Sequence, residues 1–373
     1  MSTPHDTITW GMMLRKLPSI AKAIPRVVKG MKAANVKDPT QACGLGWSFE
    51  QATLRNPDGP ALLQGEVALT YAQVNQWANR IAHHLIAQGI RKGDGVAVFI
   101  ENRPELLVTI LAVAKVGAIS ALLNTSQTRD TLVHSLNLVA PAAIIVGEEL
   151  VPAFSAVRER VSITPAHTWF VADQGTYTHP GIAPDGFINL MAASVDACGD
   201  NPASSQQVFF DDPCFYIYTS GTTGLPKGVR RKPMRPEQIA ASARVGGIAY
   251  GIKPGEDQVI LMNGPMYHSA PNSYGMLAFR SGCTIVLEPR FDPEDMLQLI
   301  ERHRITHQHM VPTMFVRLLR LPDEIKGRYD TSSLRFIVHG AAPCPPQVKR
   351  AMIEWRGPVI NEYFGSTETG IPV

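Results

Sequence analysis

The segment Tyr218-Thr-Ser-Gly-Thr-Thr-Gly-Leu-Pro-Lys-Gly228 decides the fold and most of the chemistry of this chain. It follows an apolar run at 214–218 that is predicted to be a β-strand. Glycines let backbone N–H groups turn toward an anion, hydroxyls add donors, and a lysine supplies the balancing charge. Four hydroxyls interleaved with glycines make a merely flexible turn the weaker interpretation. The segment therefore predicts a loop that binds the phosphates of a nucleotide.

Two common phosphate-binding motifs are excluded by the spacing of the residues. In the P-loop of kinases and GTPases, lysine follows glycine and precedes Ser or Thr, whereas Lys227 lies between Pro226 and Gly228. The dinucleotide fingerprint GxGxxG is also missing from this segment. The loop thus belongs to another class of nucleotide-binding protein.

Around this loop, short apolar runs alternate with helical patterns, which predicts parallel α/β sheets covered by helices. Thr70 is expected to cap a helix at 70–88 that ends at Gly89. The run 106–123 is interrupted by Lys115 and Gly117, so a helix and a strand are expected there instead of a membrane span. Strands are predicted at 95–100, 118–123, 142–146, 258–262, 284–288, 334–338 and 359–361. Further helices are predicted at 104–116, 293–302, 312–320 and 346–355.

The length of 373 residues is too great for one compact core and indicates more than one α/β unit. Gly, Pro, Ser and Asp cluster without periodicity at 172–206, which predicts a linker. We therefore expect a leader at 1–40, a first α/β subdomain with its linker at 41–205, and a second α/β subdomain at 206–373. The five cysteines are far apart and include no CxxC pair, which favours reduced thiols in the cytoplasm.

The leader carries the basic character of the chain. Residues 7–37 contain seven basic side chains and no acidic ones, so the rest of the chain is net negative although the total is +3. This distribution argues against a nucleic-acid-binding body. Apolar residues recur every three or four positions in the leader, which is typical of a helix on an anionic membrane surface. Pro18 and Pro25 oppose one continuous helix. Peripheral membrane contact through 10–37 and a tail that packs on the domain or moves freely both remain open.

Four segments in order resemble the AMP-binding, adenylate-forming family, which includes acyl-CoA synthetases, peptide-synthetase adenylation domains and luciferases. They are the phosphate loop at 218–228, the histidine segment at 266–268, the turn His-Gly-Ala-Ala-Pro at 339–343, and Asn-Glu-Tyr-Phe-Gly-Ser-Thr-Glu-Thr-Gly at 361–370. Residues 122–136 look most like very-long-chain acyl-CoA synthetases and fatty acid transport proteins. Residues 265–272 and 311–321 look more like medium- or long-chain and sterol-type ligases.

The resemblance implies the large N-terminal domain of the adenylate-forming fold, with two successive sheet-and-helix subdomains. It implies an acid–thiol ligase that uses ATP and Mg²⁺ to convert a fatty acid into an acyl-adenylate, and then transfers the acyl group to CoA. The catalytic residues it implies are Lys227, His268, Thr367 and Glu368, with Glu368 as the Mg²⁺ ligand and Thr367 at the α-phosphate. The nucleotide-binding residues it implies are Thr219, Ser220, Gly221, Thr222, Thr223, Gly224, Lys227, Gly340, Ala341, Phe364 and Thr367.

The resemblance further implies a ribose-binding aspartate and a small C-terminal domain with a catalytic lysine, and neither follows Glu368. We therefore expect a truncated chain that binds nucleotide better than it catalyses. Other functions stay open: a bile-acid, sterol-side-chain or aryl-acid CoA ligase, or a non-catalytic lipid- or nucleotide-binding protein at a membrane. His303, His307 and His309 are not expected to form a metal site, because a helix and a strand separate them.

Overall fold

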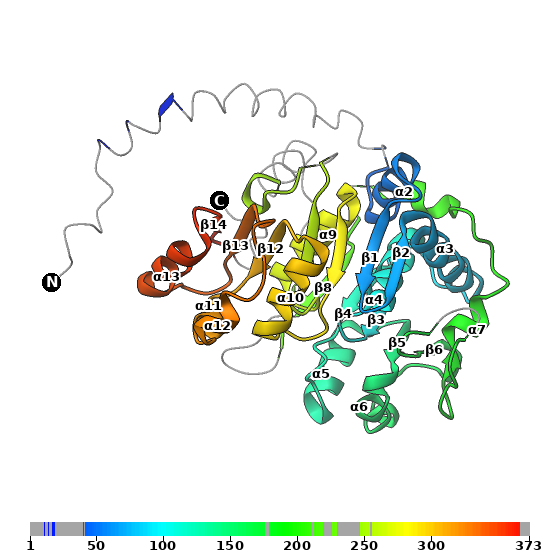
Figure 1. Ribbon diagram of the computed structural model, residues 1–373. Helices are drawn as coiled ribbons and strands as arrows, with labels where there is room; N and C mark the ends of the chain where they lie inside the picture. Colours follow the sequence, from blue (N-terminus) through cyan, green and yellow to red (C-terminus); the bar gives the residue numbers. More distant parts are fainter. Residues whose placement is uncertain are drawn as a thin grey trace.

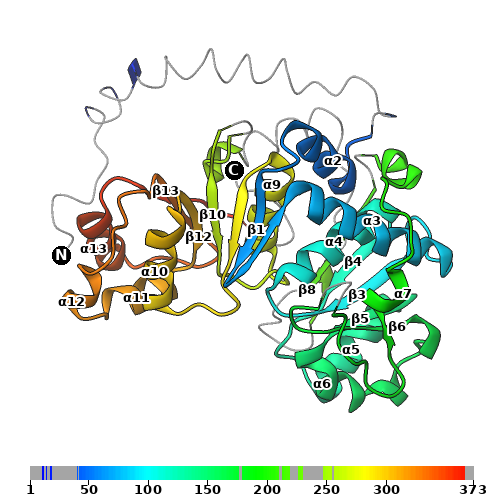
Figure 2. The ribbon, with the colours of Figure 1, turned by 45° about the vertical axis from the view of Figure 1, so that its right-hand side comes forward.

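The computed structural model describes residues 42–175, 179–209, 212–218, 226–229, 247–253 and 256–365, with Gly11, Leu14, Leu17, Pro18 and Thr40. These residues form two seven-stranded sheets, here called sheet A and sheet B, with helices between the sheets and on both outer faces (Figures 1 and 2). The predicted α/β class with two sheet-and-helix units is confirmed.

Sheet A has the strand order β14-β13-β12-β10-β11-β1-β2. All neighbouring strands are parallel except for the antiparallel pair β1–β2 at one edge. Its strands are β1 (Pro60–Gln64), β2 (Val67–Thr70), β10 (Val259–Met262), β11 (Thr284–Leu287), β12 (His307–Met310), β13 (Phe336–His339) and β14 (Ile360–Glu362).

Sheet B has the strand order β7-β6-β5-β3-β4-β8-β9, and only the pair β8–β9 is antiparallel. Its strands are β3 (Gly95–Phe99), β4 (Ile119–Leu122), β5 (Ala143–Gly147), β6 (Thr168–Val171), β7 (Ile188–Asn189), β8 (Phe215–Tyr218) and β9 (Gly228–Val229).

Helices between the sheets bury apolar side chains from both of them in one core. These helices are α2 (Leu45–Arg55), α3 (Tyr71–Ala87), α4 (Pro104–Val116) and α9 (Ser269–Ser281). Because strand side chains alternate between faces, Val96 and Val98 of β3 join this central core, whereas Ala97 and Phe99 join the outer one. Every residue of α4 is buried, which is consistent with a sequence that is apolar except at Glu105, Thr109 and Lys115.

The outer faces are covered separately. Sheet A packs on α10 (Pro293–His303), α11 (Pro312–Leu319) and α13 (Pro346–Arg356). Sheet B packs on α5 (Arg129–Val139) and α6 (Val151–Ser155). The ends of several helices are determined by local sequence. Thr70 and Gln73 form the capping box at the start of α3, and Gly117 ends α4 with φ 82°. Outside the leader, the strands and helices predicted from periodicity are all present, with ends shifted by one or two residues at most.

The expected division of the chain near residue 205 does not coincide with the division between the sheets. The hairpin β1–β2 belongs to sheet A, although most of that sheet comes from 259–362. The hairpin β8–β9 belongs to sheet B, although it follows the expected boundary. The segment 172–206, predicted to be a linker between the two units, also contains regular secondary structure. This segment adds β7 to the edge of sheet B and contains α7 (Leu190–Ser194), whose Leu190 and Met191 enter the central core.

Among the helices in the described part of the chain, none has the length and apolar character needed to span a membrane. The run 106–123, expected to be a helix and a strand, is α4 followed by β4. The leader lies almost entirely outside the described residues, so its predicted amphipathic helix stays a prediction.

Candidate active site

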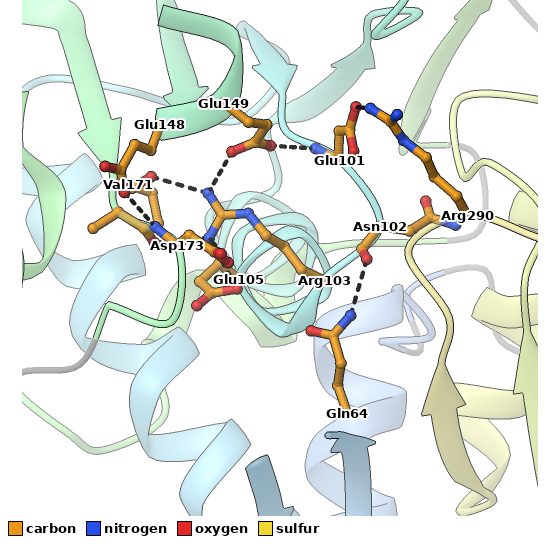
Figure 3. A network of polar contacts seen from close by, with 11 residues as sticks. Gln64, Glu101, Asn102, Arg103, Glu105, Glu148, Glu149, Val171, Asp173 and Arg290 are labelled. Atoms are coloured by element: carbon orange, nitrogen blue, oxygen red, sulfur yellow. Dashed lines mark hydrogen bonds and ion pairs between the residues drawn. The ribbon is translucent and has the colours of Figure 1, made fainter. Parts of the chain in front are cut away.

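The carboxyl ends of the strands of both sheets meet, and ligands of open α/β sheets bind at such edges. Asn102 follows β3 of sheet B, and its side chain donates to the carbonyl of Gly264, which follows β10 of sheet A, at 2.7 Å. Glu101 pairs with Arg290, which follows β11, at 2.8 Å (Figure 3). These contacts bring the loops that leave the two sheets to one side of the molecule.

The phosphate loop connects β8 to β9, which form a hairpin with Tyr218 opposite Gly228. Lys227 is therefore placed directly beside the carboxyl end of β8, and it is exposed. Helix α5 supports the hairpin: the Tyr218 hydroxyl donates to the carbonyl of Ser135 at 2.8 Å, and His134 Nε2 donates to the carbonyl of Pro226 at 2.9 Å. The loop residues Thr219, Ser220, Gly221, Thr222, Thr223 and Gly224 lie outside the described residues.

His268 is the residue immediately before α9, on the loop that follows β10. Its backbone N–H donates to the carbonyl of Pro265 at 3.0 Å and closes a tight turn. The ring packs against Tyr267 with 4.6 Å between centroids. Burial lowers the pKa of His268, so the imidazole is neutral at neutral pH and can either donate or accept a hydrogen bond.

The predicted adenine-binding residues follow adjacent strands of sheet A. Gly340 and Ala341 follow β13, and Phe364 follows β14. The Phe364 ring is 85% exposed, so one face is available to stack on a base. Gly340 is required by close packing, because a Cβ there would lie 2.6 Å from the Tyr363 ring. The remaining predicted residues, Thr367 and Glu368, lie outside the described residues.

An aromatic cluster that sequence reasoning did not predict supports this turn from inside. His309 Nε2 is hydrogen-bonded to the Tyr363 hydroxyl at 2.9 Å. The Tyr363 ring packs edge-on against Tyr250, and Tyr250 packs edge-on against Tyr274 of α9. The cluster links the turn after β14 to the helix that follows His268. Its members come from four segments, so no local sequence pattern could have identified it.

Ala341 has φ 65°, a left-handed conformation that strains a residue with a Cβ. We expect Ala341→Gly to raise the free energy of unfolding by about 0.5–1 kcal/mol, because removal of the strain exceeds the added entropy of the unfolded chain. Urea denaturation measures the change. Ala342→Gly is the matched control, since Ala342 has no positive φ, and it should be neutral or destabilising. Equal effects of the two substitutions would contradict the assignment of strain to Ala341.

Burial, with repulsion from His339 as a smaller cause, lowers the pKa of His309 to about 3. In the unfolded chain His309 is therefore protonated below about pH 6.5, whereas in the folded chain it stays neutral until the pH approaches 3. The free energy of unfolding should be constant above that pH and fall as the pH drops toward 3, by at most about 1.4 kcal/mol per pH unit for this residue. His309→Gln should reduce the slope, whereas Tyr363→Phe should keep it because the imidazole remains. Denaturation at pH 7, 6 and 5 tests this, and an unchanged slope in His309→Gln would contradict it.

Residues 49–373 match the family model described as AMP-binding enzyme, which covers most of the chain. The chain belongs to the AMP-binding enzyme family. The resemblance predicted from its four motifs is thereby confirmed.

Relatives in this family include several acid–CoA ligases. Feruloyl-CoA synthase of Amycolatopsis sp is 30% identical over 329 residues, which cover 87% of this chain and 60% of that protein. The medium/long-chain-fatty-acid–CoA ligase FadD6 of Mycobacterium tuberculosis is 29% identical over 306 residues, covering 81% of this chain and 47% of that protein. The chain thus spans about half to 60% of the length of these relatives.

Solved structures of the family share the fold. The inhibitor-bound N-terminal domain of FACL13 from Mycobacterium tuberculosis superimposes with a TM-score of 0.70 at 25% identity, over 87% of this chain and 75% of that one. The anthranilate CoA ligase AuaEII, in complex with anthranoyl-AMP, gives a TM-score of 0.77 at 23% identity, over 89% of this chain and 61% of that one. The expected large N-terminal domain of the adenylate-forming fold is confirmed.

Proposed function

We propose that this chain carries the acid-activating site of an AMP-forming fatty acyl-CoA synthetase. The observation that carries the proposal is the meeting of the two carboxyl edges. In support of the proposal, the hairpin β8–β9 of sheet B and the residues after β10, β13 and β14 of sheet A all follow the carboxyl ends of strands on this side of the molecule.

In the proposed reaction, a carboxylate oxygen of the acid attacks the α-phosphorus of ATP, and the bond to pyrophosphate breaks. The thiolate of CoA then attacks the acyl carbon and releases AMP. Negative charge grows on the phosphates in the first step, so donors and cations aimed there give most of the acceleration. We assign Lys227 and the loop 219–224 to the β- and γ-phosphates, and Thr367 to the α-phosphate. Glu368 would hold Mg²⁺, because this hard cation prefers carboxylate and phosphate oxygens.

We assign the adenine to Gly340, Ala341 and Phe364, and the junction between acid and nucleotide to His268. A neutral half-buried imidazole there can hydrogen-bond the acid without a charge of its own. We choose a fatty acid as the substrate because medium/long-chain-fatty-acid–CoA ligases are among the relatives.

Aryl acids form the second candidate class, because feruloyl-CoA synthase and 4-coumarate–CoA ligase 3 of Arabidopsis thaliana are among the relatives. ATP–pyrophosphate exchange with the full chain, driven by a panel of acids, separates the classes. The panel contains saturated fatty acids from medium to very long, ferulate, 4-coumarate and a sterol side-chain acid. We expect the largest kcat/KM with a fatty acid. A preference for ferulate or 4-coumarate would replace fatty acid by aryl acid, and the absence of both exchange and ATP binding would refute the proposal.

We also propose that residues 10–37 contact anionic membrane surfaces from the cytoplasm, as their basic charge and apolar spacing suggest. Binding to phosphatidylserine-containing vesicles should weaken at high salt and disappear when residues 1–37 are deleted. If the shortened chain binds the vesicles equally well, the leader is not the membrane-binding segment.

A further inference from the structure

Residues Glu101-Asn102-Arg103 follow β3 and connect the two sheets. Figure 3 shows the Glu101 side chain directed toward Arg290 and the Arg103 side chain directed the other way, toward Glu149 and Val171. Arg103 is held within sheet B, where it donates to the carbonyls of Ala172 and Val171 at 2.7 and 3.0 Å and pairs with Glu149 at 3.1 Å. Arg103 therefore anchors the chain next to Asn102 to sheet B, while the Asn102 side chain reaches the loop after β10 of sheet A.

The Asn102 amide binds both ends of one short segment. Its Nδ2 donates to the carbonyl of Gly264 at 2.7 Å, and its Oδ1 accepts from the backbone N–H of Met266 at 3.1 Å. Asn102 is only 5% exposed, and both hydrogen bonds are buried. Because the amide offers an N–H donor and a carbonyl acceptor in fixed geometry, the two hydrogen bonds hold the segment at both ends.

The segment bound by Asn102 leads directly into His268. Pro265 and His268 close the turn with a backbone hydrogen bond of 3.0 Å. On the opposite side, Gly264 packs so closely on α9 that a Cβ would lie 2.8 Å from Pro271 Cγ. The position of the turn, and hence of the His268 imidazole, is thus set by Asn102 on one side and by the first turn of α9 on the other.

We propose that Asn102 is a positioning residue for His268, acting through the turn 264–268. The proposal rests on the proposed function, in which His268 lies between the acid and the nucleotide. Without the amide, the buried Met266 N–H and Gly264 carbonyl lose their partners, and such groups move toward water or other partners. The turn then shifts, and His268 loses its place at the acid.

Binding of dodecanoyl sulfamoyl adenosine, a stable analogue of an acyl-adenylate, tests the proposal in the full chain. Asn102→Ala should weaken binding by about 10- to 100-fold, as expected for the loss of a buried two-bond contact. Gln64→Ala is the matched control. Gln64 donates to the main-chain carbonyl of Asn102, at 3.3 Å, and not to its amide, so its loss leaves the amide contacts in place and should change affinity by less than about 3-fold.

A double-mutant cycle separates positioning from general stability. In a His268→Ala background, Asn102→Ala should have little further effect, because the residue it positions is absent. If Asn102→Ala weakens binding by the same factor with and without His268, the two residues act independently and the proposal is overturned. If the wild type does not bind the analogue, the proposed function fails, and the positioning role is then decided by spectroscopy alone.

NMR titration of labelled histidine follows the His268 ring independently of any ligand. A loosened turn admits water, so Asn102→Ala should bring the pKa of His268 back toward its ordinary value, and Gln64→Ala should not. Asn102→Ser keeps one hydrogen-bonding group, and it replaces the alanine variant if that variant does not fold. An unchanged His268 titration in a folded Asn102 variant would overturn the proposal.

Discussion

Replacement of Lys227 by alanine is expected to weaken ATP binding by about 10- to 100-fold. A lysine that meets phosphate oxygens makes charge-assisted hydrogen bonds worth about 1.5–3 kcal/mol. Lys227 is exposed beside the carboxyl end of β8, so the free energy of unfolding should change by less than about 0.5 kcal/mol. Isothermal titration with ATP·Mg²⁺ measures the affinity, and Thr222→Ala in the same loop should show a loss in the same direction.

Lys253→Ala is the control for loss of one positive charge. Lys253 is exposed and pairs with Glu256 before β10, at the opposite end of the strands from the proposed site. It should leave ATP affinity unchanged. Unchanged affinity in Lys227→Ala as well would remove the β8–β9 hairpin from the nucleotide site.

Gly340→Ala is expected to damage both stability and nucleotide binding. The added Cβ would lie 2.6 Å from Tyr363 Cε1 and 2.7 Å from Cζ. The Tyr363 ring cannot move away easily, because its hydroxyl is hydrogen-bonded to His309 and the ring packs edge-on against Tyr250. We expect a loss of about 1–3 kcal/mol in the free energy of unfolding, as for other overpacked sites. Affinity for ATP should fall by at least about 10-fold, since the backbone of Phe364 moves with Tyr363.

Two comparisons show whether the clash is the cause. Gly327→Ala, where the new Cβ would meet only a carbonyl at 3.4 Å, should be nearly neutral. In a Tyr363→Ala background, Gly340→Ala should cost little further stability, because the ring it meets is absent. If Gly340→Ala lowers the free energy of unfolding as much in the Tyr363→Ala background as in the wild type, the clash with the ring is not the cause.

The sequence predicted local elements well because their signals are local. Helix α4 was predicted with its observed bounds, since Pro104 starts it and Gly117 ends it in the left-handed conformation. The exchange of hairpins between the sheets could not be predicted. Pairing of β1 with β11 joins residues more than two hundred positions apart, and the sequence pattern of neither strand indicates which strand it pairs with.

The candidate site was predictable only in part, for a similar reason. Gly340, Ala341, Phe364 and His268 were expected from motifs, and the structure places all four after strands of sheet A. Asn102 and His309 were not expected, because each acts through contacts with distant segments. Within 172–206, β7 and α7 were not expected, because both are too short to show periodicity.

A crystal structure of the chain with dodecanoyl sulfamoyl adenosine tests the central claim most directly. We expect the adenine beside Gly340 and Ala341 with the Phe364 ring stacked on it, the sulfamate on the side of Lys227, and the acyl chain passing His268 along α9. Adenine bound away from the carboxyl edges of the two sheets, or an acyl chain that does not pass His268, would contradict the proposed active site.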